Sequence, residues 1–160
     1  MAQKIIRYTT ARTNSDNLDF QNLVSKLDYD LALKNGAAND FFSQYNKIDK
    51  LKNVVVVYDL AGSAVGCGAM KAYADYTMEI KRMFVLADKR GKGIASQILS
   101  ELQDWAQELG YKKCILETGD KMIEAIALYK KHHFNIIPNY GQYANIENSI
   151  CFEKELFPKL

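Results

Sequence analysis

The 160-residue sequence has few of the features that mark specialised protein classes. It contains two prolines, three cysteines and two histidines, and its formal net charge is only +2. The balanced charge, with no clustered basic stretch, argues against nucleic acid as the main partner. No run of about 18 apolar residues is present to span a bilayer. The opening MAQKIIRYTT is too short and too polar for a signal peptide, so we expect a cytoplasmic protein without a membrane partner.

The cysteines and histidines are too scattered to predict a metal site. Cys67, Cys114 and Cys151 are widely spaced in apolar stretches, and only His132 and His133 are adjacent. A structural zinc site normally takes closely spaced pairs of Cys or His ligands. Buried, reduced thiols are therefore the expected state of the three cysteines, and no metal is expected.

Apolar residues, which make up 48% of the sequence, recur with helical and strand periods in alternation. Steps of three and four from Phe20 to Leu31 predict an amphipathic helix, capped by Ser15 or Asp16 and ended by Gly36. A longer apolar stripe from residue 94 to 109 predicts a second helix with a glycine stop. Further helices are expected over residues 39–45 and 121–132, and strands over residues 4–8, 53–58, 64–73, 77–85, 112–117, 134–137 and 149–156.

The order of these elements predicts one α/β domain over residues 1–160. Three successive strands between residues 53 and 85 favour an antiparallel meander, and Gly66 and Gly68 predict a bulge or a close backbone approach within it. The strand–helix–strand order from residue 77 to 117 predicts a right-handed crossover between parallel strands. We expect a mixed, mostly antiparallel sheet of about seven strands with one parallel pair, flanked by about four helices.

The stretch EIKRMFVLADKRGKGIA, residues 79–95, carries the strongest functional pattern. It is typical of a strand, a short loop and two glycines that open a helix. The first N–H groups of a helix lack internal partners and lie at the positive end of its dipole, so they bind anions. Lys89, Arg90 and Lys92 add positive charge at this point. The pattern predicts a loop that binds the diphosphate of a nucleotide-type cofactor.

Two other phosphate-binding patterns share features with this loop. Lys92 lacks the Gly-x-x-x-x-Gly-Lys-Ser/Thr context, which excludes a nucleoside triphosphatase of that class. Gly91-x-Gly93-x-x-Ser96 is close to the dinucleotide fingerprint, and Glu117 ends the next strand about 20 residues on. Against a dinucleotide fold stand the serine at the third position, the five residues LADKR before the first glycine, and the short remaining chain. The dinucleotide-binding domain stays open as the less favoured alternative.

Residues 90–95, RGKGIA, have the form Arg-x-x-Gly-x-Ala, which resembles the diphosphate site of the GNAT-type N-acetyltransferases. EIKRMFV resembles the fourth strand of that family, and ALYKKHHF resembles its Ala-x-x-Leu-Tyr-x-x-x-Gly-Phe segment. The order of elements also matches over essentially the whole length. The resemblance implies a GNAT-like fold with acetyl-CoA as co-substrate. It also implies acetylation of a primary amine, on a small molecule or a peptide, by direct transfer in a ternary complex.

The resemblance also implies roles for individual residues. Deprotonating a lysine-like amine with a pKa of about 10.4 costs roughly 4–5 kcal/mol at pH 7. Glu79 is the candidate base, acting directly or through water. Tyr129 is the candidate acid for the departing CoA thiolate. The expected cofactor contacts are Met83, Phe84, Val85, Lys89, Arg90, Gly91, Lys92, Gly93, Ile94, Ala95 and Ser96.

Two positions depart from the family pattern. Met122 stands where the family often has Asn, and His133 replaces the Gly before the Phe. Because His tolerates a left-handed backbone better than most residues, His133 is predicted to end the helix.

The acceptor is expected near the first helices and the loop from residue 138 to 149, with Asp28, Tyr140 and Tyr143 as candidate contacts. Either a monomer or a homodimer is compatible with the sequence. A module that binds or senses acyl-CoA without turnover is the alternative from a different functional class.

Overall fold

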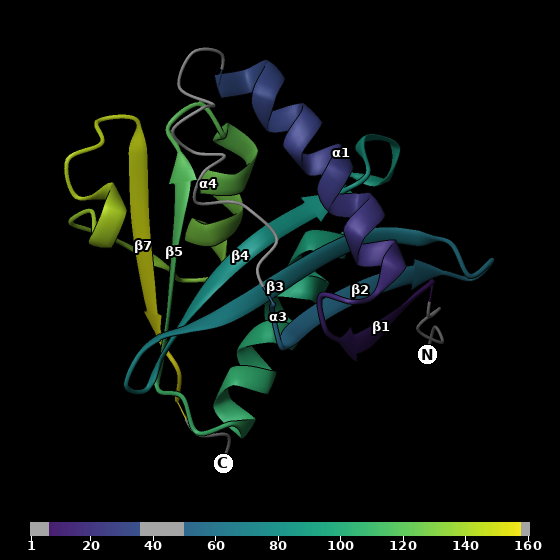
Figure 1. The fold of residues 1–160 in the computed structure, drawn as a ribbon, viewed down its shortest axis with the longest axis horizontal. Coiled ribbons are helices and arrows are strands. Elements are labelled where there is room, and N and C mark those ends of the chain that lie inside the picture. Colours follow the sequence, from purple (N-terminus) through teal and green to yellow (C-terminus); the bar gives the residue numbers. More distant parts are fainter. Residues whose placement is uncertain (1–6, 36–49, 158–160) are drawn as a thin grey trace, which may run out of the picture.

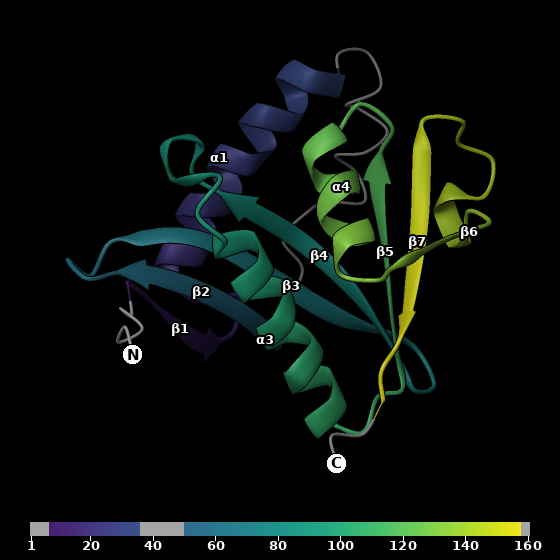
Figure 2. The same ribbon diagram turned by 180° about the vertical axis from the view of Figure 1, so that it is seen from behind.

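The computed structural model describes residues 7–35 and 50–157, which form a seven-stranded sheet with helices on both faces (Figures 1 and 2). The strand order is β1-β2-β3-β4-β5-β7-β6, and every neighbouring pair is antiparallel except β4 and β5. This confirms the expected mostly antiparallel sheet with one parallel pair. The strands are β1 (Tyr8–Thr13), β2 (Asn53–Asp59), β3 (Ala64–Ala74), β4 (Thr77–Val85), β5 (Lys113–Gly119), β6 (Asn135–Ile137) and β7 (Ser149–Glu155); the helices are α1 (Leu18–Asn35), α3 (Ile94–Glu108) and α4 (Ile123–Lys131), with 3-10 turns η2 (Ala87–Lys89) and η3 (Gly141–Tyr143).

The two faces of the sheet are covered by different helices. Helix α1 packs on one face, and α3 and α4 pack on the other (Figures 1 and 2). The four successive valines of β2 are all buried, because the strand lies between two apolar layers. Val54 and Val56 belong to the apolar cluster beneath α1, and Val55 and Val57 belong to the cluster beneath α3. The alternation of side chains along a strand places apolar residues in both layers, so a continuous apolar run is needed.

Strands β4 and β5 are paired over only part of their length. The parallel pairing runs from Thr77 with Lys113 to Glu79 with Ile115. Strand β4 continues to Val85, and β5 continues to Gly119, but the two strands diverge beyond the pairing (Figure 1). The ends of these strands therefore lie on either side of a wedge in the sheet, which α4 flanks on one face.

A bulge in β4 accompanies this divergence. Arg82 and Met83 lie opposite the single residue Gly68 of β3, and Arg82 has a φ of 62°. A Cβ on Gly68 would lie 2.7 Å from both Ile98 Cγ2 and Met83 Sδ. Of the two predicted alternatives, the bulge is confirmed at Gly68, where side chains of α3 and β4 pack against the glycine. The bulge directs Arg82 toward α1, where it pairs with Asp28.

The expected first strand, residues 4–8, is displaced. Strand β1 covers Tyr8–Thr13, a stretch that looks too polar for a strand, and residues 4–6 lie outside the described residues. Strand β1 lies at the edge of the sheet, where its side chains are only partly covered, so it needs few apolar residues. Its Arg12 binds Glu101 and Glu108 of α3. The expected helix over residues 39–45 and the expected stop at Gly36 also lie outside the described residues.

The cap of α1 is also one residue away from the prediction. The Asn17 side chain, rather than Ser15 or Asp16, accepts the Phe20 N–H at 2.9 Å. Ser15 is used differently, because its hydroxyl accepts the Leu51 N–H and so ties two distant segments together. Asn is as good an N-cap as Ser or Asp, so composition alone did not distinguish the three neighbours.

The three cysteines are in the state expected from the sequence. Cys67, Cys114 and Cys151 are buried free thiols. Burial raises the pKa of Cys67 and Cys114 to about 12, which keeps both protonated at neutral pH. Within residues 7–35 and 50–157, no helix is long and apolar enough to cross a membrane.

Candidate active site

Helix α3 is preceded by two glycines with positive φ angles. Gly91 has a φ of 77° and Gly93, the N-cap, a φ of 82°. No side chain caps the helix start, and a Cβ built on either glycine would meet no atom within 4 Å. The first N–H groups of α3 therefore border open space at the positive end of the helix dipole. This is the geometry predicted for an anion site.

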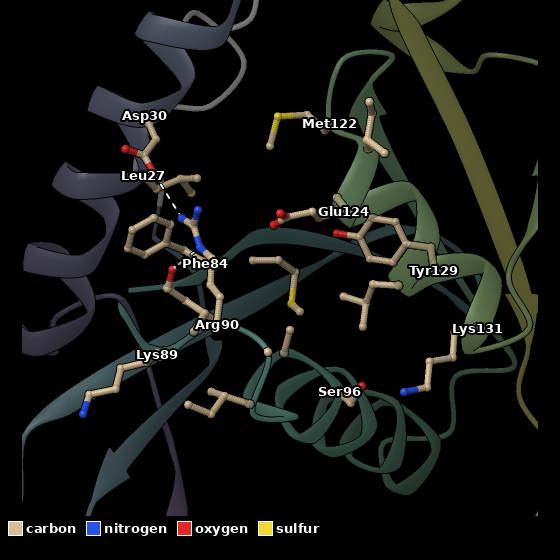
Figure 3. A pocket seen from close by; sticks show the side chains of 18 of the residues that line it. Leu27, Asp30, Phe84, Lys89, Arg90, Ser96, Met122, Glu124, Tyr129 and Lys131 are labelled. Atoms are coloured by element: carbon tan, nitrogen blue, oxygen red, sulfur yellow. Dashed lines mark hydrogen bonds and ion pairs between the residues drawn. The ribbon is translucent and has the colours of Figure 1, made fainter. Parts of the chain in front are cut away.

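A cavity of about 550 Å³ lies between this helix start, β4, α1 and α4 (Figure 3). Five of its lining side chains are cationic and two are acidic, so the cavity favours an anionic ligand. Of the predicted cofactor contacts, only Lys92 does not line it. The predicted residues that do are Met83, Phe84, Val85, Lys89, Arg90, Gly91, Gly93, Ile94, Ala95 and Ser96.

The Arg90 side chain is held by protein groups along one wall of the cavity. Its Nε donates to the Val85 carbonyl at 3.0 Å, and its Nη2 lies 3.1 Å from Asp30 of α1. The guanidinium also lies over the Phe84 ring, 5.7 Å from its centre. We infer that the Arg90 side chain fixes the loop before α3 against β4 and α1. The backbone of Arg90 lies beside the start of α3.

Tyr129 of α4 points into the cavity from the opposite wall (Figure 3). Its ring packs against Phe134 and Phe152, at centre-to-centre distances of 5.9 and 5.7 Å. Burial, together with the nearby Glu117 carboxylate, raises the pKa of Tyr129 above its ordinary value. The hydroxyl is therefore neutral at physiological pH.

A smaller pocket of about 110 Å³ adjoins this cavity. Their shared lining contains Met83 and Tyr129, so a group held in one pocket lies next to a group held in the other. The further residues common to both are Leu27, Met122 and Ala125. The smaller pocket differs from the cavity in its balance of charge, because two acidic and two cationic side chains line it: Glu79, Glu117, Lys81 and Arg82.

Glu79 is buried and held on two sides. The Tyr140 hydroxyl donates to its Oε2 at 2.6 Å, and Lys81 Nζ lies 3.6 Å from its Oε1. Burial and the neighbouring carboxylate raise the pKa of Tyr140, which keeps this hydroxyl a donor. The predicted base is thus oriented by a residue that was predicted to contact the acceptor.

Glu117 of β5 is a second carboxylate of the site, partly buried, which the sequence reasoning missed as a site residue. It lies two residues beyond the last β5 residue paired with β4. Burial raises its pKa to about 7; a hydrogen bond from Ser149 and the charge of Lys81 oppose the rise, and Glu79 adds to it. The Ser149 hydroxyl lies 3.0 Å from its Oε2. A lone carboxylate after the apolar run CIL was the available signal.

The remaining positions singled out in the sequence lie in different surroundings. Tyr143 lines the smaller pocket, whereas Asp28 lines neither and binds Arg82 at 2.7 Å. Met122, where the family often has Asn, presents its side chain to the wall shared by both pockets. His133 has a φ of 67° and its N–H bonds the Lys130 carbonyl, so the predicted left-handed helix end is confirmed.

The model of the acetyltransferase (GNAT) family matches residues 17–134 of the sequence. The chain belongs to the GNAT family. The match covers the helix start, β4, β5 and α4, and therefore the whole cavity described above. Family membership supports acyl transfer from acetyl-CoA as the chemistry, and GNAT acetyltransferases act in general on amine acceptors.

Individual relatives agree with this family assignment. An IAA acetyltransferase of Azospirillum brasilense is 36% identical over 97 residues, covering 60% of this chain and 63% of that protein. The uncharacterized N-acetyltransferase YsnE of Bacillus subtilis is 33% identical over 93 residues, covering 57% and 62%. The alignments therefore span less than two thirds of these curated relatives.

Solved structures share the fold at low sequence identity. An acyl-CoA N-acyltransferase structure from Klebsiella pneumoniae has a TM-score of 0.78 at 24% identity, covering 94% of this chain and 98% of that one. A GNAT acetyltransferase from Elizabethkingia anophelis, with acetyl-CoA bound, has a TM-score of 0.66 at 20% identity, covering 94% and 99%. The mostly antiparallel sheet excludes the doubly wound sheet of the dinucleotide alternative.

Proposed function

We propose that the protein is an N-acetyltransferase that moves an acetyl group from acetyl-CoA to a primary amine in a ternary complex. One observation supports this above the others. The cavity at the start of α3 and the carboxylate-lined pocket share a wall that contains Tyr129. An acyl donor in the first and an amine in the second would meet beside a base and an acid.

The cavity fits the chemical groups of acetyl-CoA. Gly91 and Gly93 leave open space where a Cβ would otherwise approach a diphosphate, and the uncapped N–H groups of α3 supply donors. Lys89, Lys121 and Lys131 add positive charge around the cavity. The diverging part of β4, including Met83 and Val85, would accept the extended pantetheine portion in the wedge between the strands.

The two carboxylates of the smaller pocket would take the proton from the acceptor amine. When bound, acetyl-CoA supplies a thioester whose acetyl carbon passes to the amine nitrogen as the carbon–sulfur bond breaks. Glu79 is oriented by Tyr140, and Glu117, with its pKa near 7, changes protonation state in the physiological range. A base whose pKa lies near the working pH combines availability with basicity. We assign amine deprotonation to this pair.

Tyr129 would give its proton to the departing thiolate. Its neutral hydroxyl is directed into the cavity, and the packing of its ring on Phe134 and Phe152 fixes its position. The proton balance then closes, because an ammonium acceptor loses two protons: one passes to a carboxylate before the attack, and the second leaves the nitrogen as the amide forms and offsets the proton that Tyr129 gives to the sulfur. Solvent returns both side chains to their starting states.

A panel of primary amines with acetyl-CoA, read by free thiol release, tests the proposal. We expect release to depend on the amine. We also expect Glu79→Gln and Tyr129→Phe each to lower kcat about 100-fold, the typical contribution of one proton-transferring group. Acetyl-CoA affinity measured by calorimetry should change little in either variant. Unchanged release rates in both variants would reject the residue assignment, and binding of acetyl-CoA without release for any amine would favour the sensing module.

A further inference from the structure

Arg82 is a buried cation in the wall of the smaller pocket. Its side chain is only 2% exposed, and its Nη1 lies 2.7 Å from Asp28 Oδ1. The Nε and Nη2 atoms are buried, and neither has a hydrogen-bond partner among the residues that the structure describes. Leaving a buried donor unpaired costs about 1–3 kcal/mol, and more for a charged group. The pair of unpaired donors therefore indicates a place that a ligand completes.

The two unpaired atoms define the shape of that ligand. Nε–H and one N–H of Nη2 lie parallel along the same edge of the planar guanidinium. This edge binds both oxygens of a carboxylate in a bidentate pair. Asp28 occupies the other terminal nitrogen, Nη1, so no described residue pairs with the carboxylate-binding edge.

The backbone around Arg82 is also unusual. Its φ of 62° is strained for a residue with a Cβ, and it sits in the bulge opposite Gly68. Such conformations cost about 1–3 kcal/mol and persist where the surrounding structure holds them, often at functional sites. The bulge places Arg82 in the same pocket wall as Glu79, three positions earlier in β4.

The smaller pocket is lined by equal numbers of negative and positive side chains. Glu79 and Glu117 supply negative charge, and Lys81 and Arg82 supply positive charge, around about 110 Å³. A polyamine would place a second cation near Arg82, and a peptide N-terminus would place a neutral amide there. A small zwitterion matches both the size and the charge distribution.

We propose that the acceptor is a free amino acid and that Arg82 binds its carboxylate while its amine faces the Glu79–Glu117 pair. The reaction of that amine rests on the proposed acetyltransferase function, but the binding of the zwitterion does not. Arg82 is therefore a residue that determines acceptor specificity.

Calorimetric titration of the full chain, saturated with CoA, tests this binding directly. The probes are matched pairs of amino acid and decarboxylated amine: alanine with ethylamine, histidine with histamine, and tyrosine with tyramine. Alaninamide adds a probe without the carboxylate charge. We expect at least one amino acid to bind about tenfold or more tightly than its decarboxylated partner, which is about 1.4 kcal/mol. Arg82→Lys keeps the charge but loses the bidentate edge, so it should remove most of this preference. Arg12→Lys is the matched control, because Arg12 binds Glu101 and Glu108 of α3 and lines neither pocket, so this variant should keep the preference.

The wild-type comparison stands even if an Arg82 variant does not fold. Equal affinity within every pair, or no binding of any amino acid, would overturn the proposal. A full preference in folded Arg82→Lys and Arg82→Met would overturn it as well. Thiol release measured on the same compounds separates the two proposals. A preference for amino acids without thiol release would leave this inference standing and reject the acetyltransferase function. Thiol release with amines, but no preference for compounds with a carboxylate, would support the acetyltransferase function and reject this inference.

Discussion

The Tyr140 hydroxyl donates a 2.6 Å hydrogen bond to the Glu79 carboxylate, joining the loop after β6 to the strand that carries the proposed base. A hydrogen bond to a charged group contributes about 1.5–3 kcal/mol. We therefore expect Tyr140→Phe to lower kcat about 10- to 100-fold, because Glu79 loses its fixed orientation. Steady-state kinetics should show a smaller change in the KM for acetyl-CoA. Tyr73→Phe is the control, since Tyr73 packs its ring against Tyr140 and should leave kcat nearly unchanged.

The raised pKa of Glu117 predicts a pH-dependent rate. Below a pH of about 7 this carboxyl is protonated and cannot accept a proton from the amine. We expect kcat/KM to rise as the pH increases through about 7 and then to level off. Glu117→Gln should lower the rate and remove this ionisation from the profile. A profile with the same midpoint in wild type and variant would assign the ionisation to another group.

The same carboxyl should make folding stability depend on pH. Its pKa is higher in the folded chain, about 7, than the ordinary value of 4.5, so the folded state binds the proton more tightly. That stability is present below pH 4.5 and is lost as the pH rises through 7. The loss is about 3 kcal/mol, at 1.36 kcal/mol per pKa unit.

Glu117→Gln should therefore unfold at a higher urea concentration than wild type at pH 8. The difference should shrink toward zero at pH 4, where Glu117 is protonated in the wild type. Glu153→Gln on β7 is a control, because Glu153 is partly exposed beside Lys113 and should give no such pH-dependent gain. A constant difference at all pH values would contradict the assignment.

Gly91 should be needed more for cofactor binding than for folding. Its positive φ makes Ala strained by about 1–2 kcal/mol, although the added Cβ meets no protein atom. We expect Gly91→Ala to weaken acetyl-CoA binding about tenfold or more, since the methyl group would occupy the space proposed for the diphosphate.

Gly110→Ala is the matched control for this prediction. Gly110 also has a positive φ and open space, but it lies at the opposite end of α3. Both variants should lose similar stability in urea denaturation, and only Gly91→Ala should lose affinity in calorimetry. Equal affinities would remove the helix start from the proposed cofactor site.

Gly68 should tolerate substitution less well than Gly66. A Cβ on Gly68 would lie 2.7 Å from Ile98 Cγ2, whereas the nearest atoms to a Cβ on Gly66 are 3.0 to 3.1 Å away. Overpacking of this kind costs about 1–3 kcal/mol, so we expect Gly68→Ala to show the larger loss in urea denaturation. Because Met83 must also move, acetyl-CoA affinity should fall in this variant. Equal losses for both glycines would contradict the tight packing at the bulge.

The sequence by itself determined the class of fold and the place of the proposed anion site. Apolar periodicity located the helices and strands near the site, because burial imposes periods of 3.6 and 2 wherever a face packs on the core. The glycine pair before Ile94 marked the start of α3, since only glycine adopts the required backbone freely. The polar edge strand β1 lacked such a pattern, and its position was therefore displaced in the prediction.

Tertiary structure alone decided the composition of the smaller pocket. Glu79 and Arg82 on β4, Glu117 on β5 and Tyr140 in a distant loop converge only because β4 and β5 diverge and β4 is bulged. Burial and hydrogen bonding are properties of that convergence, and they set both the pKa of Glu117 and the unpaired edge of Arg82. A one-dimensional pattern does not contain them, because desolvation depends on neighbours that are far away in the chain.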